Sequence, residues 1–214
     1  EPYRRQRQMC IRDRKILDGD AGLIDEYADV YEMIKNMRDL ERILNAKRRA
    51  RGSINFIGEE PKFTLSEDGR VLDIVPYPYE ESNLIIEEFM LLANETVAEF
   101  MYHTELPFVY RVHEAPTNEK IQEFRRFVAS FNYKFIAHKT VHASEYQKLL
   151  DEIHGSPEER IISRVMLRSM QKAKYAVDNG GHFGLALDYY CHFTSPIRRY
   201  PDLMIHRIIK SMLS

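Results

Sequence analysis

The sequence predicts an α+β fold in which long helices pack on a small antiparallel sheet. Apolar residues recur at helical spacing over residues 23–44 and 83–103. Short runs rich in β-branched and aromatic residues lie between these two stretches, separated by turn-forming residues. The 214 residues, 44% of them hydrophobic and 30% charged, can bury a core, which excludes a disordered or rod-like chain.

The first long helix is predicted over residues 23–44. It leads into a basic cluster at residues 47–51, which Gly52 follows. Because the helix dipole favours cations at a helix C-terminus and glycine often terminates helices, the cluster has a structural interpretation. A contact with RNA is the alternative, and the sequence does not decide between the two.

Short strands are predicted next, over residues 54–57, 62–65 and 71–75. The last two are joined by residues 66–69, Ser-Glu-Asp-Gly, which are typical turn formers. This pattern predicts a small antiparallel meander.

The rest of the chain alternates helices with short extended segments. Helices are predicted over residues 83–103, 118–131, 144–153 and 157–175, and a strand over residues 108–113. A glycine pair then precedes residues 183–193, for which strand and extended loop are equally compatible. No repeat or low-complexity linker is found, so we expect one continuous unit.

Several classes of protein are excluded. The apolar runs fall far short of the roughly 20 residues that span a bilayer, and none follows the basic N-terminus as in a signal peptide. We therefore expect a cytoplasmic protein without membrane association. Cys10 and Cys191 form no CxxC or Cys/His cluster, so neither a disulfide framework nor a zinc site is indicated.

The net charge of −2 conceals an uneven distribution along the chain. Counted over Lys, Arg, Asp and Glu, residues 1–14 carry +3, residues 15–159 carry −11 and residues 160–214 carry +6. The C-terminal block is therefore the candidate surface for a polyanion. Helix-surface charges that only improve solubility are the alternative.

Residues 1–14 have a separate interpretation. The run RRQRQMCIRDR at residues 4–14 is the translation of a transposase adapter that is used to prepare sequencing libraries. We expect residues 1–14 to be such an artefact and the natural segment to start near Lys15. A basic arm that binds nucleic acid is the alternative.

Residues 192–207 are the most informative stretch. Ser195 is a suitable N-cap and Pro196 suits the first helical position, so Arg198 and Arg199 are predicted in the first turn of a helix. Cations there oppose the helix dipole, which indicates an anionic ligand such as phosphate. A structural ion pair with nearby acidic groups is the alternative.

These residues also resemble a known family. His182 to Leu185, Thr194 to Leu203 and His206-Arg207 closely resemble the signature of the ribonuclease R and ribonuclease II family of processive 3′-to-5′ exoribonucleases, closest to its ribonuclease R branch. The resemblance covers residues 15–214. It implies the C-terminal half of a ribonuclease II-type catalytic domain, without the aspartate-bearing N-terminal half and the flanking OB-fold domains.

The resemblance implies roles for four side chains. Arg198 matches the arginine that stabilises the scissile phosphate, and Arg199 matches the neighbouring residue that contacts the RNA backbone. Phe56 matches the aromatic residue that stacks on terminal bases, and Glu87 matches a glutamate near the terminal nucleotides. The alternatives for the last two are a core phenylalanine in a strand and a carboxylate that favours a helix N-terminus.

The resemblance also implies a Mg²⁺-dependent enzyme that hydrolyses single-stranded or structured RNA to nucleoside 5′-monophosphates. In the family, clustered aspartates hold the metal, and no matching cluster is found here, because Asp18-Gly19-Asp20 lies elsewhere in the family's pattern and is an ordinary turn. We expect no metal ligand in this chain, and no activity from the chain alone. His182, His192 and His206 are interpreted as structural groups.

Two other functions stay open at this point. One is a non-catalytic RNA-binding module that retains Arg198 and Arg199. The other is a structural α+β fragment without a ligand. Clustered aspartates encoded upstream would favour the enzyme, and RNA binding that does not depend on salt would argue against both RNA-related functions.

Overall fold

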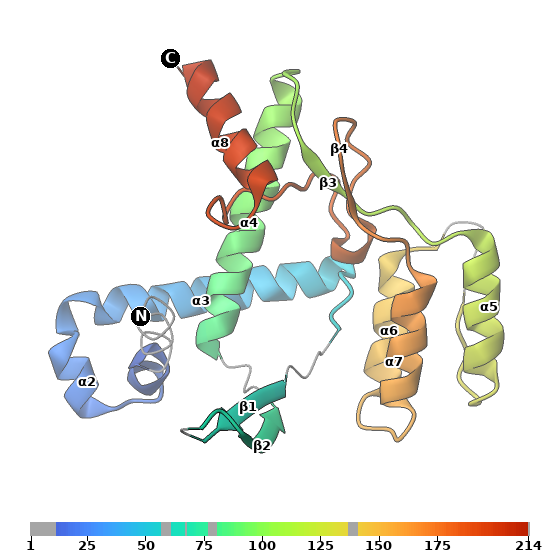
Figure 1. Ribbon diagram of the computed structural model, residues 1–214, viewed down its shortest axis with the longest axis horizontal. Coiled ribbons are helices and arrows are strands. Elements are labelled where there is room, and N and C mark those ends of the chain that lie inside the picture. The colour runs from blue at the N-terminus through green and yellow to red at the C-terminus, as the bar shows by residue number, and fades with distance from the viewer. Residues whose placement is uncertain (1–11, 57–60, 67, 77–80, 137–140, 214) are drawn as a thin grey trace. The chain divides into compact units, whose positions relative to one another are not determined.

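A computed structural model describes residues 12–56, 61–66, 68–76, 81–136 and 141–213 (Figure 1). Most of the adapter-like run therefore lies outside the described residues. Residues 12–17 are helical, and the helices that follow are α2 (Ala21–Glu26), α3 (Ala28–Arg51), α4 (Glu81–His103), α5 (Asn118–Ala129), α6 (Ala143–Ile153), α7 (Glu159–Ser169), α8 (Tyr200–Leu213) and the 3₁₀ helix η1 (Phe183–Leu185). The strands are β1 (Pro61–Leu65), β2 (Val71–Pro76), β3 (Tyr110–Val112) and β4 (Lys174–Ala176), in two antiparallel pairs. The predicted α+β class is confirmed.

The chain forms two compact units, where the sequence indicated one. The first unit comprises Glu1–Leu44 and Phe56–Phe89, and the second comprises Asn45–Asn55 and Met90–Ser214. The long helices α3 and α4 each run through the division. No flexible linker therefore marks it, which is why composition did not reveal it.

The helix predicted over residues 23–44 is divided into α2 and α3. Asp20 caps α2, since its Oδ1 accepts a hydrogen bond from the Leu23 N–H at 3.1 Å. Tyr27, with φ −115° and ψ 29°, interrupts the helix before α3 begins. The apolar spacing continues across this break, so periodicity alone could not show it.

The C-terminus of α3 carries the predicted basic residues in its last turn. Gly52 follows with φ +85°, a conformation that glycine adopts far more easily than other residues. A Cβ atom at this position would lie 2.5 Å from Cβ of Ser144, beside the start of α6. The glycine thus ends the helix and also permits a close approach of the two segments.

The predicted hairpin is confirmed as β1 and β2, which pair in antiparallel register from Pro61↔Pro76 onward. The third strand, predicted from residue 54, is not formed by residues 54–56, and residue 57 lies outside the described residues. Instead, the Ile54 N–H donates a hydrogen bond to the Gly184 carbonyl at 2.8 Å. The apolar side chains of the hairpin are exposed, and they are Phe63, Leu65, Val71, Leu72, Ile74 and Val75.

In the second unit, α4, α5 and α6 confirm the predicted helices to within about two residues. The helix predicted over residues 157–175 is too long, because α7 ends at Ser169. Residues 174–176 form β4 instead, where Tyr175 pairs with Arg111 of β3. A partner distant in the sequence here overrides the local helical pattern.

Two groups of buried side chains hold the second unit together. The first joins α4, β3 and α8 through Ala98, Met101, Phe108, Tyr110, Val112, Cys191 and Ile205. In the second, α5, α6 and α7 lie side by side (Figure 1). Phe124, Phe135 and Tyr146 contact one another there, with ring centroids 4.7–5.7 Å apart. These two groups form the apolar core on which the loops ahead of α8 rest.

Strand β3 also binds the loop that leads toward α8. The Arg111 N–H donates to the Tyr190 carbonyl at 2.8 Å, and the His113 N–H donates to the Gly181 carbonyl at 3.0 Å. The Phe183 N–H donates back to the His113 carbonyl at 2.8 Å. Residues 181–190 are therefore fixed along β3.

Among the described residues, no helix is long and apolar enough to cross a membrane.

Candidate functional site

The two arginines singled out in the sequence lie in a tight turn ahead of α8. The N–H groups of Arg198 and Arg199 both donate to the Ser195 carbonyl, at 3.3 and 3.1 Å, and the helix begins only at Tyr200. The prediction that they occupy the first turn of a helix is therefore wrong. Pro201 explains the difference, because it has no N–H group with which to continue a helix from the preceding turn.

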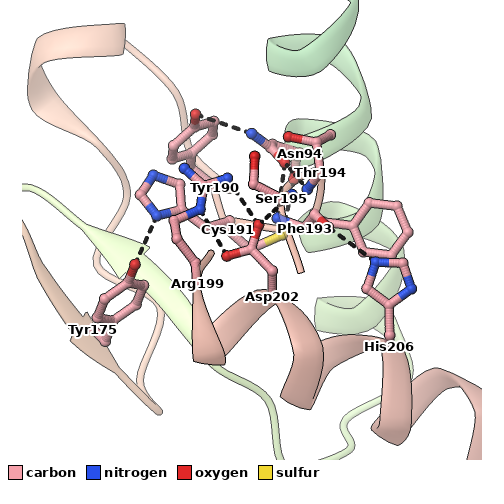
Figure 2. Close-up of polar contacts among 11 residues, drawn as sticks. Asn94, Tyr175, Tyr190, Cys191, Phe193, Thr194, Ser195, Arg199, Asp202 and His206 are labelled. Carbon is pink, nitrogen blue, oxygen red and sulfur yellow. Dashed lines mark hydrogen bonds and ion pairs between the residues drawn. The ribbon is translucent and has the colours of Figure 1, made fainter. Parts of the chain in front are cut away.

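A single buried carboxylate closes this turn. Asp202, which is 0% exposed, lies in the first turn of α8. Its Oδ1 accepts from the Ser195 N–H at 2.7 Å and from Arg199 Nη2 at 2.8 Å, and its Oδ2 accepts from Arg199 Nε at 2.9 Å (Figure 2). For Arg199, the structural ion pair considered as an alternative is therefore present.

The loop before the turn is held by a second buried side chain, from α4. Asn94, 2% exposed, accepts through Oδ1 from the N–H groups of Phe193 and Thr194, at 2.9 and 3.2 Å. Its Nδ2 donates to the Tyr190 hydroxyl at 3.2 Å. His206 Nε2 donates to the Phe193 carbonyl at 3.0 Å (Figure 2). The backbone N–H groups of residues 193–195 thus all point toward buried side-chain oxygens.

Arg198 differs sharply from its neighbour. Its side chain is exposed and has no hydrogen bond or ion pair within the part of the chain that the structure describes. Ile197, beside it, is completely exposed. The turn therefore has a fixed backbone and presents one guanidinium group that no described carboxylate neutralises.

Positive charge gathers around His192, which lies in the same loop. Burial is the largest cause that lowers the pKa of His192 to about 4, followed by the positive charges of Arg199 and Arg111. Arg198 acts in the same direction, and only Asp202 opposes them. His192 is therefore neutral near pH 7, and the arginines outnumber the carboxylate around it.

Arg111 was not singled out as a site residue from the sequence. It lies on β3 between the buried Tyr110 and Val112, and alternation along a strand directs its side chain to the opposite face. Its guanidinium lies 4.7 Å from the centroid of the Tyr175 ring. The Tyr175 hydroxyl is hydrogen-bonded to His192 Nδ1 at 2.8 Å. An arginine between apolar strand residues was the signal that could have identified it.

His113 and His182 form hydrogen bonds with backbone N–H groups of the protein. His182 Nδ1 accepts from the Leu185 N–H at 3.2 Å, and His113 Nδ1 accepts from the Gly184 N–H at 3.1 Å. Burial, followed by the charges of His113 and Arg111, lowers the pKa of His182 to about 3. The three histidines that were interpreted as structural, His182, His192 and His206, thus all form hydrogen bonds within the protein.

Phe56 and Glu87 belong to the first unit, whereas Arg198 and Arg199 belong to the second. Phe56 is partly exposed and lies outside any strand, so it does not match the alternative of a core residue in a strand. Glu87 is partly exposed on α4, which begins at Glu81. Because the dipole effect is confined to the first turn, a preference for the helix N-terminus does not explain Glu87.

Side chains that could hold a metal ion do not cluster among the described residues. Among the residues that the structure describes, no group of three or more His, Cys, Asp or Glu side chains could hold a metal ion. Asp20 caps α2, and Asp202 is hydrogen-bonded to Arg199 and to the Ser195 N–H. Both carboxylates are thus engaged by the protein itself.

Residues 11–214 match the family model of the RNB domain. Ribonuclease R of Thermotoga maritima is 41% identical over 210 residues, which cover 98% of this chain and 29% of the relative. Ribonuclease R of Aquifex aeolicus is 40% identical over 198 residues, covering 92% of this chain and 28% of the relative. The chain therefore spans less than a third of the length of these curated relatives.

Solved structures show the same similarity. RNase R of Mycoplasma genitalium, in complex with ribose-methylated single-stranded RNA, matches with a TM-score of 0.80 and 33% identity over 84% of this chain and 28% of that one. Yeast Ssd1, a pseudonuclease, matches with a TM-score of 0.61 and 24% identity over 83% of this chain and 23% of that one. The second likeness concerns the fold alone.

Proposed function

Because the chain belongs to the RNB domain family, we propose that it is part of the catalytic domain of a processive 3′-to-5′ exoribonuclease. The parent enzyme would hydrolyse RNA phosphodiester bonds and release nucleoside 5′-monophosphates, in RNA degradation and turnover. The observation that carries this proposal is the exposed Arg198 on a turn of fixed backbone, next to a loop in which the charges of Arg198, Arg199 and Arg111 all act on His192. Similarity to proteins named Ribonuclease R supports it.

In this proposal Arg198 stabilises the scissile phosphate. Its guanidinium is not neutralised by any described carboxylate, so it is available to an oxygen on which negative charge develops in the transition state. A guanidinium presents a planar fork of N–H donors that matches phosphate oxygens, which an ammonium group does not reproduce.

Arg199 would contact the RNA backbone with the N–H groups that Asp202 leaves unused. A guanidinium carries five N–H donors, and the ion pair engages Nε and Nη2. Phe56 would stack on the terminal bases, and Glu87 would lie near the terminal nucleotides. Arg111 adds positive charge at the same site as Arg199.

Ribonucleases of the RNB family are generally metal-dependent hydrolases. For the parent enzyme we propose Mg²⁺, bound, as the family resemblance implies, by aspartates outside this chain; among the described residues no group of three or more potential ligands could hold it. The substrate would be single-stranded or structured RNA. The similar Mycoplasma genitalium enzyme has been seen in complex with single-stranded and with double-stranded RNA. By its relatedness to bacterial ribonuclease R, we place the parent enzyme in the cytoplasm.

Substitution of Arg198 in the intact parent enzyme tests this proposal. Arg198→Ala should lower the single-turnover rate on labelled RNA by about 10²-fold or more while changing RNA affinity little. Arg198→Lys should restore the rate only in part, because a point charge lacks the bidentate geometry. Arg125→Ala, which removes an exposed arginine from α5, is the matched control and should leave the rate unchanged.

Two outcomes would contradict the proposal. Wild-type turnover in Arg198→Ala would refute the assigned role of this residue. RNA binding without hydrolysis by the intact wild-type protein would favour the non-catalytic RNA-binding module instead.

A further inference from the structure

The turn that carries Arg198 is attached at both of its ends to the same carboxylate group. At its start, the Ser195 N–H donates to Asp202 Oδ1 at 2.7 Å. At its end, Arg199 donates to both oxygens of Asp202, at 2.8 and 2.9 Å. Arg198 lies between these attachments in the sequence, and among the described residues its side chain forms no hydrogen bond or ion pair with Asp202. The position of the Arg198 backbone is therefore set by its two flanking contacts.

Burial makes this arrangement hard to change. Asp202 is fully buried, and the Arg199 side chain is only 18% exposed. If the turn shifted, a charged carboxylate would lose hydrogen bonds in a site that water cannot reach, which is strongly unfavourable. Buried ion pairs of this kind can select one conformation even where they add little net stability.

The preceding segment is held in the same way. Asn94 accepts the N–H groups of Phe193 and Thr194, so the chain enters the turn from a fixed position. Groups that act on a transition state must be held within about 0.5 Å of their productive geometry by surrounding contacts. The turn has such contacts on both sides of Arg198, and they all come from buried side chains.

We propose that Asp202 is a positioning residue that aims Arg198 at the substrate phosphate. In this inference, which rests on the proposed function, Arg199 contributes through its ion pair as well as through any contact with RNA. Asp202 itself touches neither substrate nor reacting atoms. Its effect on the reaction passes through Arg198, and this dependence can be measured.

The test uses single-turnover kinetics of the intact parent enzyme with Asp202→Asn, Arg198→Ala and the double variant. Asn can still accept from the Ser195 N–H but places an N–H group against the Arg199 guanidinium. Asp202→Asn should lower the rate at saturating RNA about tenfold or more, since small misplacements of a reacting group can cost up to about 10²-fold. RNA affinity should change by no more than about threefold.

The double variant separates positioning from general structural damage. If Asp202 acts through Arg198, Asp202→Asn should cost no further rate once Arg198 is Ala, while its effect on the thermal midpoint persists in both backgrounds. Ile162→Val serves as a control, because it alters a fully buried side chain of α7 away from the turn. It should lower the thermal midpoint and leave the single-turnover rate unchanged.

The outcomes distinguish the two proposals. Rate losses that multiply in the double variant of an active enzyme would overturn the positioning role and leave the proposed function intact. An inactive wild-type enzyme would refute the proposed function. If the wild-type enzyme is inactive, hydrogen exchange of residues 193–199, measured by mass spectrometry on the same proteins, would still test whether Asp202 holds the turn in place. Faster exchange in Asp202→Asn would support the attachment of the turn, and unchanged exchange would overturn it.

Discussion

Among the described residues, the two short antiparallel ribbons β1–β2 and β3–β4 differ in how far their side chains are buried. In β3, Tyr110 and Val112 are buried, and the strand gains further hydrogen bonds from the loop at residues 181–190. In the hairpin, apolar side chains such as Leu72 and Ile74 are 67% and 59% exposed. Since an isolated two-stranded ribbon is at best marginally stable, its packing decides whether it can support a site.

The two ribbons therefore have different roles: β3 belongs to a buried core, whereas the hairpin exposes its apolar side chains. The β3–β4 ribbon borders the core formed with α4 and α8, and from there the fixed loop leads to the turn that carries Arg198. The hairpin borders no comparable core among the described residues. Changes near β3 should therefore affect folding and the site together, whereas changes in the hairpin should affect association.

The largest effect should come from the core beside β3. Met101→Ala removes a fully buried side chain and should lower the free energy of unfolding by about 2–5 kcal/mol. Leu72→Ala, in the exposed hairpin, should change it by no more than about 0.5 kcal/mol. Urea unfolding of the soluble chain at low concentration measures both. Equal losses would show that the hairpin is packed as well as β3.

A second effect is a loss of stability at acid pH, which should be confined to the region around β3. The pKa values of His182 and His192, about 3 and about 4, lie below the ordinary value of about 6.5. The folded state thus binds fewer protons than the unfolded state. The contribution of these two histidines to the free energy of unfolding should be fully present above about pH 6.5. It should be lost as the pH falls from there through the two folded-state pKa values.

Hydrogen exchange at several pH values measures this effect locally. Exchange over residues 181–192 should accelerate between about pH 6.5 and pH 4, while residues 61–76, which contain no histidine, should respond much less. His182→Gln should reduce the pH dependence. Equal acid sensitivity of the two segments would contradict the assignment to these buried imidazoles.

Elements that are determined by local sequence could be predicted, whereas elements that depend on distant partners could not. Helix α5 was predictable because its apolar spacing is regular and Thr117 accepts from the Lys120 N–H as its N-cap. The hairpin was predictable from its turn residues. The break at Tyr27 and the strand β4 were not, because local pattern continues across the first and a distant partner forms the second.

The sequence singled out Arg198 and Arg199 but could not show which neighbouring side chains bind them. From the residues alone, Arg198 and Arg199 were both predicted to face an anionic ligand, and the family resemblance then implied a different role for each. Their surroundings in the structure differ, because the buried Asp202 binds the side chain of Arg199 and no described carboxylate binds that of Arg198. Which carboxylate faces which guanidinium depends on how the chain restarts at Tyr200, and this is set by packing of α8 against α4.

A smaller effect concerns solubility and tests the hairpin directly. We expect this chain by itself to be poorly soluble, because contiguous exposed apolar side chains promote association. Replacing Leu72 and Ile74 with Lys should raise the soluble fraction several-fold without lowering the thermal midpoint. Sedimentation after expression gives the soluble fraction. As a control, Lys at the already polar Asp73 should have little effect, and a comparable gain there would indicate net charge as the cause.

The smallest expected effect is that of Mg²⁺ on this chain. A ligand stabilises a folded protein only if it binds a site that the unfolded chain lacks, and the thermal midpoint then rises with ligand concentration. In the first unit Asp20 caps α2, and in the second Asp202 is engaged by Arg199 and the Ser195 N–H, so neither carboxylate is available to a metal. Added Mg²⁺ should therefore shift the thermal midpoint no more than NaCl of equal ionic strength, and any binding of single-stranded RNA should survive chelation by EDTA. A saturable rise that NaCl does not reproduce, or RNA hydrolysis by this chain with Mg²⁺, would show that it contains a metal site after all.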